Sequence, residues 1–149
     1  MTLKTFDRTL QETNEWLESL EMEMGWDDRP FAYKVLRAVL HVLRDRLTPE
    51  EAVNLGAQLP MLIRGFYYEG WDIAKAPVIL RDKNLFLNNI SDKLDGGTTL
   101  GKQIDAERLS RAVFKLLTHR LSSGEVDGIR SQLPGEIEAL WPHNPASSG

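Results

Sequence analysis

Apolar residues recur every three or four positions along most of the chain, the spacing that places side chains on one face of an α-helix. The first stripe predicts a helix over residues 3–24 with Phe6, Leu10, Thr13, Leu17, Leu20 and Met24 along one face. A second stripe, over about residues 30–47, is too broadly apolar for a surface helix and predicts a core helix. No strand-like alternation of credible length occurs, so the pattern predicts an all-α fold.

Residues with special backbone preferences mark the ends of these helices. Gly25 is expected to stop the first helix, and Asp27 or Asp28 to cap the second, which has Pro30 in its first turn. These signals predict a short turn between two long helices.

Two shorter helices are predicted next. Thr48 and Glu51 have the spacing of a capping box, in which the hydroxyl accepts from the Glu51 amide and the Glu51 carboxylate accepts from the Thr48 amide. The third helix is expected to reach about residue 58, and Pro60 either ends it or opens a fourth helix through residue 69. We therefore interpret Glu51 as part of a helix start and not as a catalytic carboxylate.

The second half of the chain repeats the first. Residues 37–67 align without a gap on residues 111–141, an offset of 74 positions (111 − 37), and share Gln-Leu-Pro at 58–60 and 132–134. Further helices are expected from about residue 82 to 94, 105 to 121, 122 to 132 and in a short turn through 141. A fixed offset of this kind indicates a duplicated structural unit.

The duplication sets the expected organisation. We predict one compact globular domain with a first unit at residues 1–72, a connection at 73–81, a second unit at 82–142 and a disordered tail at 143–149. A single unit cannot bury its own core helix. The two tandem units, each of three to four helices, are therefore expected to pack through these helices as a pseudo-twofold helical bundle.

Composition narrows the classes of partner. The chain has 149 residues and a net charge of −4 with acidic and basic residues interspersed, so we expect no nucleic acid as partner. It lacks the run of about 20 apolar residues that spans a membrane, and it has no cysteine for disulfides or zinc. The first 16 residues contain no signal-peptide core, which predicts a cytoplasmic location.

Two stretches resemble a known family. RAVLHVLRDRLTPEEAVNLGAQLPMLIRGFYYEGWD at residues 37–72 and SSGEVDGIRSQLPGEIEALWP at 122–142 are similar to the two halves of the bacterial family catalogued as domain of unknown function 2267. The resemblance extends from about residue 6 to 142. It implies a small, cytoplasmic, all-helical protein with no assigned activity and no catalytic residue to carry over. Gly128 and Ser131 depart from the family pattern, so we expect a looser helix there.

Candidate catalytic side chains are few. His41, His119 and His143 have no partners at the spacing of a metal motif. His41 aligns with Lys115 in the repeat and His119 aligns with Asp45, so we interpret both histidines as lying on solvated helix faces. Nucleophile-elbow and phosphate-loop motifs are also absent. We expect no enzyme activity, no cofactor and no metal.

The segment 64–72 breaks the repeat and is the best candidate binding site. It gathers four aromatic residues, an arginine and two carboxylates, and the second half has no equivalent. Two interpretations are open: the aromatic residues plug the junction between the halves, or they form an exposed patch of the types that dominate protein interfaces. The candidate residues are Arg64, Tyr67, Tyr68, Trp71 and Asp72.

Two functions are compatible with these observations. The first is a non-enzymatic adaptor or regulator that binds a protein partner, or a second copy of itself, through segment 64–72. The alternative is a small-ligand binder or enzyme in which Arg64 holds an anionic group in the cleft between the units, near Tyr68 or Glu69.

Overall fold

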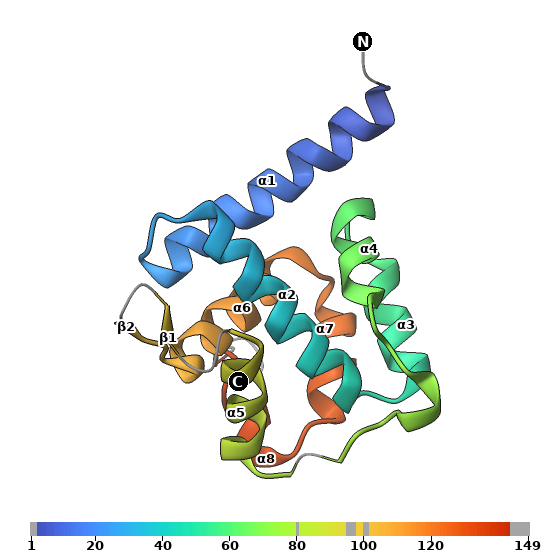
Figure 1. The fold of residues 1–149 in the computed structure, drawn as a ribbon. Coiled ribbons are helices and arrows are strands. Elements are labelled where there is room, and N and C mark those ends of the chain that lie inside the picture. The colour runs from blue at the N-terminus through green and yellow to red at the C-terminus, as the bar shows by residue number, and fades with distance from the viewer. Residues whose placement is uncertain (1–2, 80, 95–97, 100–101, 144–149) are drawn as a thin grey trace.

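The computed structural model describes residues 3–79, 81–94, 98–99 and 102–143 (Figure 1). These residues form an all-helical fold, as predicted, with one two-residue antiparallel ribbon in a loop where no strand was expected. The helices are α1 (Lys4–Met24), α2 (Arg29–Arg46), α3 (Pro49–Ala57), α4 (Met61–Tyr68), the 3-10 turn η1 (Ile73–Lys75), α5 (Lys83–Lys93), α6 (Ala106–Arg120), α7 (Ser123–Ser131) and α8 (Gly135–Glu138), and the strands are β1 (Thr98–Thr99) and β2 (Lys102–Gln103).

The predicted helix boundaries form. Gly25 ends α1 in the left-handed conformation, with a φ of 68°. Asp28 opens α2 by accepting from the Phe31 amide at 3.0 Å. Pro60 both ends the α3 segment and precedes α4. At Gly25 and Asp28, a glycine or a side chain satisfies backbone groups that have no partner within the helix.

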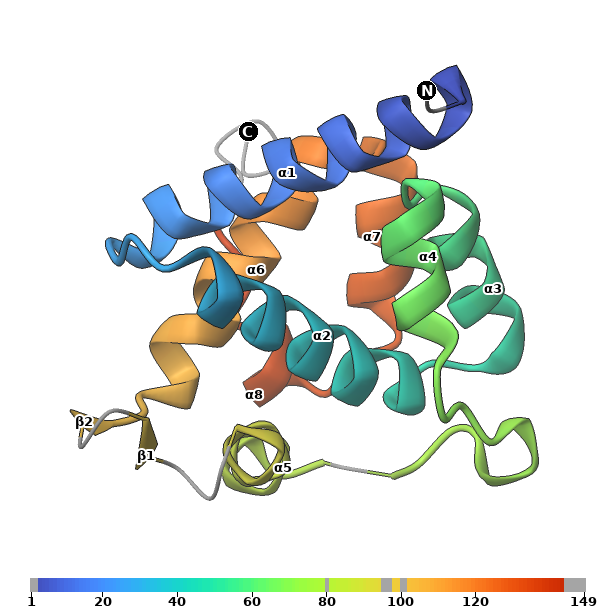
Figure 2. The ribbon, with the colours of Figure 1, turned by 45° about the horizontal axis from the view of Figure 1, so that its top comes forward.

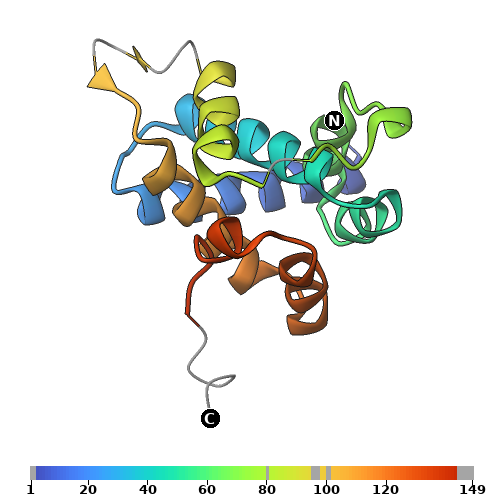
Figure 3. The ribbon, with the colours of Figure 1, turned by 90° about the horizontal axis from the view of Figure 1, so that it is seen from below.

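The core lies between α2, α6 and the two helices that cover them. α2 packs against α6, α1 crosses both, and α5 covers both on the side away from α1 (Figures 2 and 3). Leu36 and Leu40 of α2 and Phe114 of α6 are fully buried there. Phe114 also stacks on Trp141, with ring centroids 4.4 Å apart.

α1 is longer than the core it covers. Leu17, Leu20 and Met24 of the predicted stripe are buried, but Phe6 and Leu10 are 53% and 49% exposed. The first turns of α1 project past the central helices (Figure 1). The apolar stripe is continuous along the helix, but the core ends before the stripe does.

The two halves of the chain also meet where α3 packs against α7. The Gln132 side chain accepts from the Thr48 amide at 3.0 Å, and the Gln58 side chain accepts from the Ser122 amide at 3.2 Å. The predicted capping box is therefore half correct. The Thr48 hydroxyl accepts from the Glu51 amide at 3.4 Å, but the Thr48 amide donates to Gln132 and not to Glu51.

α7 forms as a regular helix around Gly128. A Cβ atom at this position would lie 3.0 Å from Oε1 of Glu51, so the glycine permits the close approach of α3. The predicted disordered tail lies outside the described residues, apart from His143. No helix within the described ranges is both long enough and apolar enough to cross a membrane.

Candidate functional site

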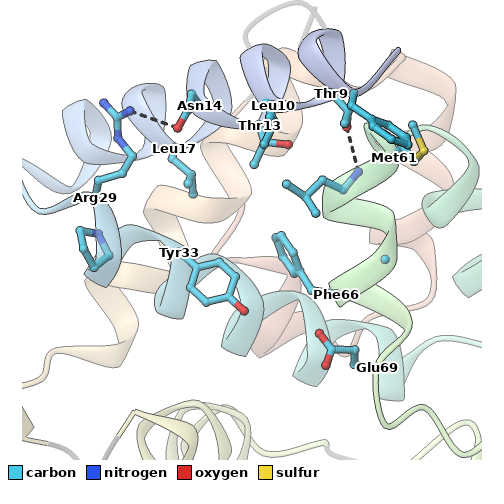
Figure 4. A pocket seen from close by; sticks show the side chains of 14 residues that line it. Thr9, Leu10, Thr13, Asn14, Leu17, Arg29, Tyr33, Met61, Phe66 and Glu69 are labelled. Carbon is cyan, nitrogen blue, oxygen red and sulfur yellow. Dashed lines mark hydrogen bonds between the residues drawn. The ribbon is translucent and has the colours of Figure 1, made fainter. Parts of the chain in front are cut away.

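An open apolar groove of about 900 Å³ lies between α1, the start of α2 and α4 (Figure 4). Five large apolar side chains border this groove, and each is 39% to 53% exposed. They are Phe6, Leu10, Tyr33, Met61 and Leu62. Exposed apolar side chains that gather around one concavity indicate a contact surface.

The α1 wall of this groove arises from the stripe that the sequence shows. Leu10, Thr13 and Leu17 lie on one face because residues three and four apart are neighbours on a helix. Figure 4 shows Thr13 and Leu17 pointing from α1 toward Tyr33 of α2 and Phe66 of α4. The apolar stripe therefore faces the groove in the N-terminal part of α1.

A hydroxyl group of α1 fixes the start of α4. Pro60 precedes α4 and supplies no side-chain cap. The Thr9 hydroxyl accepts instead from the Leu62 amide at 2.9 Å (Figure 4). One of the amides that lack a partner at the start of α4 is thus satisfied by a side chain of α1. This hydrogen bond fixes the separation of α1 and α4 at the groove.

Two buried side chains of α2 fix the other end of α4. Nε2 of His41 lies 2.6 Å from the Phe66 carbonyl oxygen. Nη1 of Arg44 donates to the carbonyl oxygens of Tyr67 and Glu69 at 2.6 and 2.9 Å. The last carbonyls of a helix have no partner within it and favour a nearby cation. His41 and Arg44 therefore stabilise the position of α4 against α2.

The prediction that His41 lies on a solvated face is wrong. Its side chain is 3% exposed, and burial lowers the pKa of the imidazole. The ring is therefore neutral near pH 7, and Nε2 must carry the proton because a carbonyl oxygen can only accept.

Sequence reasoning also missed Arg44, which is 2% exposed. One signal could have identified it. The second half has Lys115 and Thr118 where the first half has His41 and Arg44 (41 + 74 and 44 + 74). These two differences are three residues apart and so share one helix face. On a core helix, two polar residues on one face that differ from the aligned residues of the other half indicate a specific buried contact.

Most of the predicted aromatic patch packs inward. Tyr67 is fully buried and donates its hydroxyl to the Ala52 carbonyl oxygen at 2.7 Å, and burial raises the pKa of this phenol. Tyr68 is half-buried, and its ring lies against Gly56, where any Cβ would collide with it. Trp71 lies next to Tyr68, with ring centroids 5.7 Å apart. Of the two open interpretations, the exposed patch does not hold for Tyr67, because its ring belongs to the core.

The charged members of the predicted site are engaged locally. Arg64 donates through Nε to the Gly56 carbonyl oxygen and through Nη2 to that of Leu59, both at 2.9 Å, so it caps the end of α3. Asp72 accepts from the Ala74 amide at 3.0 Å and opens η1. The Arg64 donors that the alternative function would offer to an anion are thus largely used by the backbone.

A pair of carboxylates lies between α3 and α7. Burial and the neighbouring Glu51 carboxyl raise the pKa of Glu125 to about 7. One oxygen of each carboxyl is buried without a hydrogen-bond partner, and Gln58 donates to the other Glu125 oxygen at 3.4 Å. The two groups can share a proton. Within the described ranges, no three acidic or histidine side chains lie close enough to hold a metal.

Comparison with known proteins places the chain without assigning a role to the groove. No curated protein matches it. A family model does match, over residues 13–140, which is most of α1 through α8. The chain therefore belongs to the family described as uncharacterized conserved protein (DUF2267), as its sequence resemblance predicted.

Proposed function

We propose that this protein is a non-enzymatic interaction protein that binds an amphipathic helix in the groove between α1 and α4. The observation that supports this most directly is the exposure of five large apolar side chains around one hollow of about 900 Å³. An amphipathic helix can bury such residues by inserting its own apolar stripe, the helix-in-groove mode of recognition.

The groove has the properties of a preformed binding surface. Its walls are helices held by the Thr9–Leu62 bond at one end and by His41 and Arg44 at the other. A surface fixed in this way loses little conformational entropy on binding. Tyr33, Phe66 and Met61 supply the aromatic and thioether groups that are enriched at interface centres.

The binding element is still α4, but its binding face is the one that borders the groove and not the one that carries Tyr67. Met61, Leu62 and Phe66 line the groove, whereas Tyr67 packs into the core. A role for Tyr68, Trp71 and Asp72 in binding remains a separate prediction. Such a protein needs no cofactor or catalytic residue, and we propose none.

We also propose that the two halves are copies of one unit. The bonds of Gln58 to the Ser122 amide and of Gln132 to the Thr48 amide are reciprocal. Gln58 and Gln132 have the same backbone angles, φ −93° and ψ −4°. The copies differ where α4 has eight residues and α8 has four, so the helix that departs from the repeat is the one that builds the groove.

The function is tested with a fluorescently labelled model helix of about 18 residues, with leucine at helical spacing and lysine elsewhere. We expect saturable binding in fluorescence anisotropy, weakened by at least about tenfold in Leu62→Asp, because a charge would enter the apolar groove. Val53→Asp is the matched control, since Val53 is 49% exposed and does not line the groove.

A scrambled peptide of the same composition controls for attraction between lysines and an acidic protein. Equal binding of both peptides, or unchanged binding by Leu62→Asp, would contradict the proposed function.

A further inference from the structure

The apolar groove continues into an exposed apolar stripe at the start of α1. Leu3, Phe6 and Leu10 are 63%, 53% and 49% exposed and follow the three- and four-residue spacing of an apolar helix stripe. This stripe lies at the projecting end of α1 (Figure 1). Phe6 and Leu10 also line the groove, so the stripe and the groove form one continuous apolar surface that the same surface of a second copy can cover.

The charges of α1 favour one direction for such a contact. Lys4, Asp7 and Arg8 lie in its first turns and give that end a net charge of +1, and Glu12, Glu15 and Glu18 follow without an intervening base. Basic residues near a helix start oppose the preference set by the helix dipole. Neither base forms an ion pair with any of the described residues. Two α1 helices side by side repel if they are parallel and attract if they are antiparallel.

We propose that the groove is occupied by α1 of a second copy, which packs antiparallel along the first α1 in a twofold dimer. This inference depends on the proposed function of the groove. With the twofold axis near Leu10, Leu3 of one copy lies beside Leu17 of the other. In this register Lys4 lies opposite position 16, about 3 Å along the helix from Glu18. Its long side chain can reach Glu18, because positions 4 and 18 share one flank of the helix.

Twofold symmetry doubles the effect of each contact. The same surface is used by both copies, so each apolar stripe enters the other copy's groove and both are buried together. Leu3, Phe6 and Leu10 precede the segment that matches the family model. The inference therefore concerns this chain and not the family as a whole.

Sedimentation over a concentration series tests the dimer. We expect reversible dimers, and an association constant lowered at least tenfold in Leu3→Glu, which removes an apolar contact without altering a residue that lines the groove. Lys4→Glu and Glu18→Lys should each weaken the dimer, and the double variant should restore it, because the exchanged charges face each other again. A monomer at all concentrations, or a double variant no better than the single ones, would overturn the proposal.

Cross-linking tests the position of the axis. The chain has no cysteine, so Leu10→Cys introduces a single thiol. Two Leu10 positions at a twofold axis are close enough for a disulfide, and we expect oxidation to yield a covalent dimer. Val53→Cys, equally exposed but outside the groove, is the control. Equal cross-linking of the two variants would show that α1 is not the contact.

The model helix separates this inference from the function on which it depends. The Leu3→Glu variant should bind the peptide at least as well as the unmodified protein, because its groove is no longer filled. If the unmodified protein is a monomer and binds the peptide, the dimer is contradicted and the proposed helix-binding function still holds. A monomer that does not bind it overturns both.

Discussion

At the scale of single residues, the main feature that sequence reasoning missed is the buried cation Arg44. It donates to two carbonyl oxygens at the end of α4 and pairs with Asp45 at 2.8 Å. A buried charge is stable only when its hydrogen bonds are made. Arg44 meets this condition with backbone groups that no sequence pattern marks.

Replacing Arg44 with Met should destabilise the protein by about 3 kcal/mol, because the Tyr67 and Glu69 carbonyls would lose their donor in a buried site. The free energy of unfolding in urea measures this. Arg111→Met is the matched control. Arg111 makes an exposed pair with Glu107 four residues away, so the change should be below about 0.5 kcal/mol. Equal effects would show that burial of Arg44 is unimportant.

The residues that the sequence did identify at this scale are those that act locally. Gly25, Asp28 and Thr48 end or begin helices as predicted, because a cap depends on neighbours within a few positions. His41 was assigned wrongly because its partner, the Phe66 carbonyl, is 25 residues away.

At the scale of elements, the contact between α3 and α7 brings two carboxyl groups together. Glu51 was correctly interpreted as a residue near a helix start, because its backbone amide donates to the Thr48 hydroxyl. Glu125 holds the equivalent position in α7, where its amide donates to the Ser122 hydroxyl. Their carboxyl groups nevertheless meet between the helices, and this raises the pKa of Glu125 to about 7.

This pair predicts a pH dependence of stability. Between the ordinary carboxyl pKa of 4.5 and about 7, the folded chain holds a proton on Glu125 that the unfolded chain has lost. The contribution of Glu125 to stability therefore falls as pH rises through this range. The Glu125→Gln side chain stays neutral at all pH values. Relative to the unmodified protein, the free energy of unfolding of this variant should therefore increase by about 1 kcal/mol between pH 5 and pH 8, a value reduced for partial solvent screening.

The measurement is urea unfolding of both proteins at pH 5 and pH 8. At each pH, the unfolding free energy of one protein is subtracted from that of the other. This difference cancels the contribution of His41, whose lowered pKa makes stability rise with pH and not fall. A difference that does not change with pH would contradict the proton-sharing pair.

At the scale of the whole molecule, the main departure from expectation is where the core ends. Burial of α1 is complete at Leu20 and stops before Leu10 and Phe6, although the apolar stripe continues. The groove exists because α1 extends beyond the central helices and meets α4, which packs against both α1 and α2 and leaves a hollow between them.

If Phe6 and Leu10 serve a surface and not the core, the double variant Phe6→Gln, Leu10→Gln should keep its stability within about 1 kcal/mol. Leu20→Ala should cost about 2–5 kcal/mol, because Leu20 is fully buried. Denaturation in a sample dilute enough to be monomeric measures both. A loss of several kcal/mol in the double variant would return these residues to the core.

The sequence by itself determined the helices, most of their ends and the all-helical class, because periodicity and caps are local properties of the chain. It also identified the family. Which apolar side chains are covered, which polar groups are buried and where an open surface remains were decided only by the tertiary structure. Tyr67 and Phe6 illustrate the difference, since both are aromatic residues on helices and one is fully buried while the other is 53% exposed. Burial depends on what packs against a residue from distant parts of the chain, and a local pattern does not contain that information.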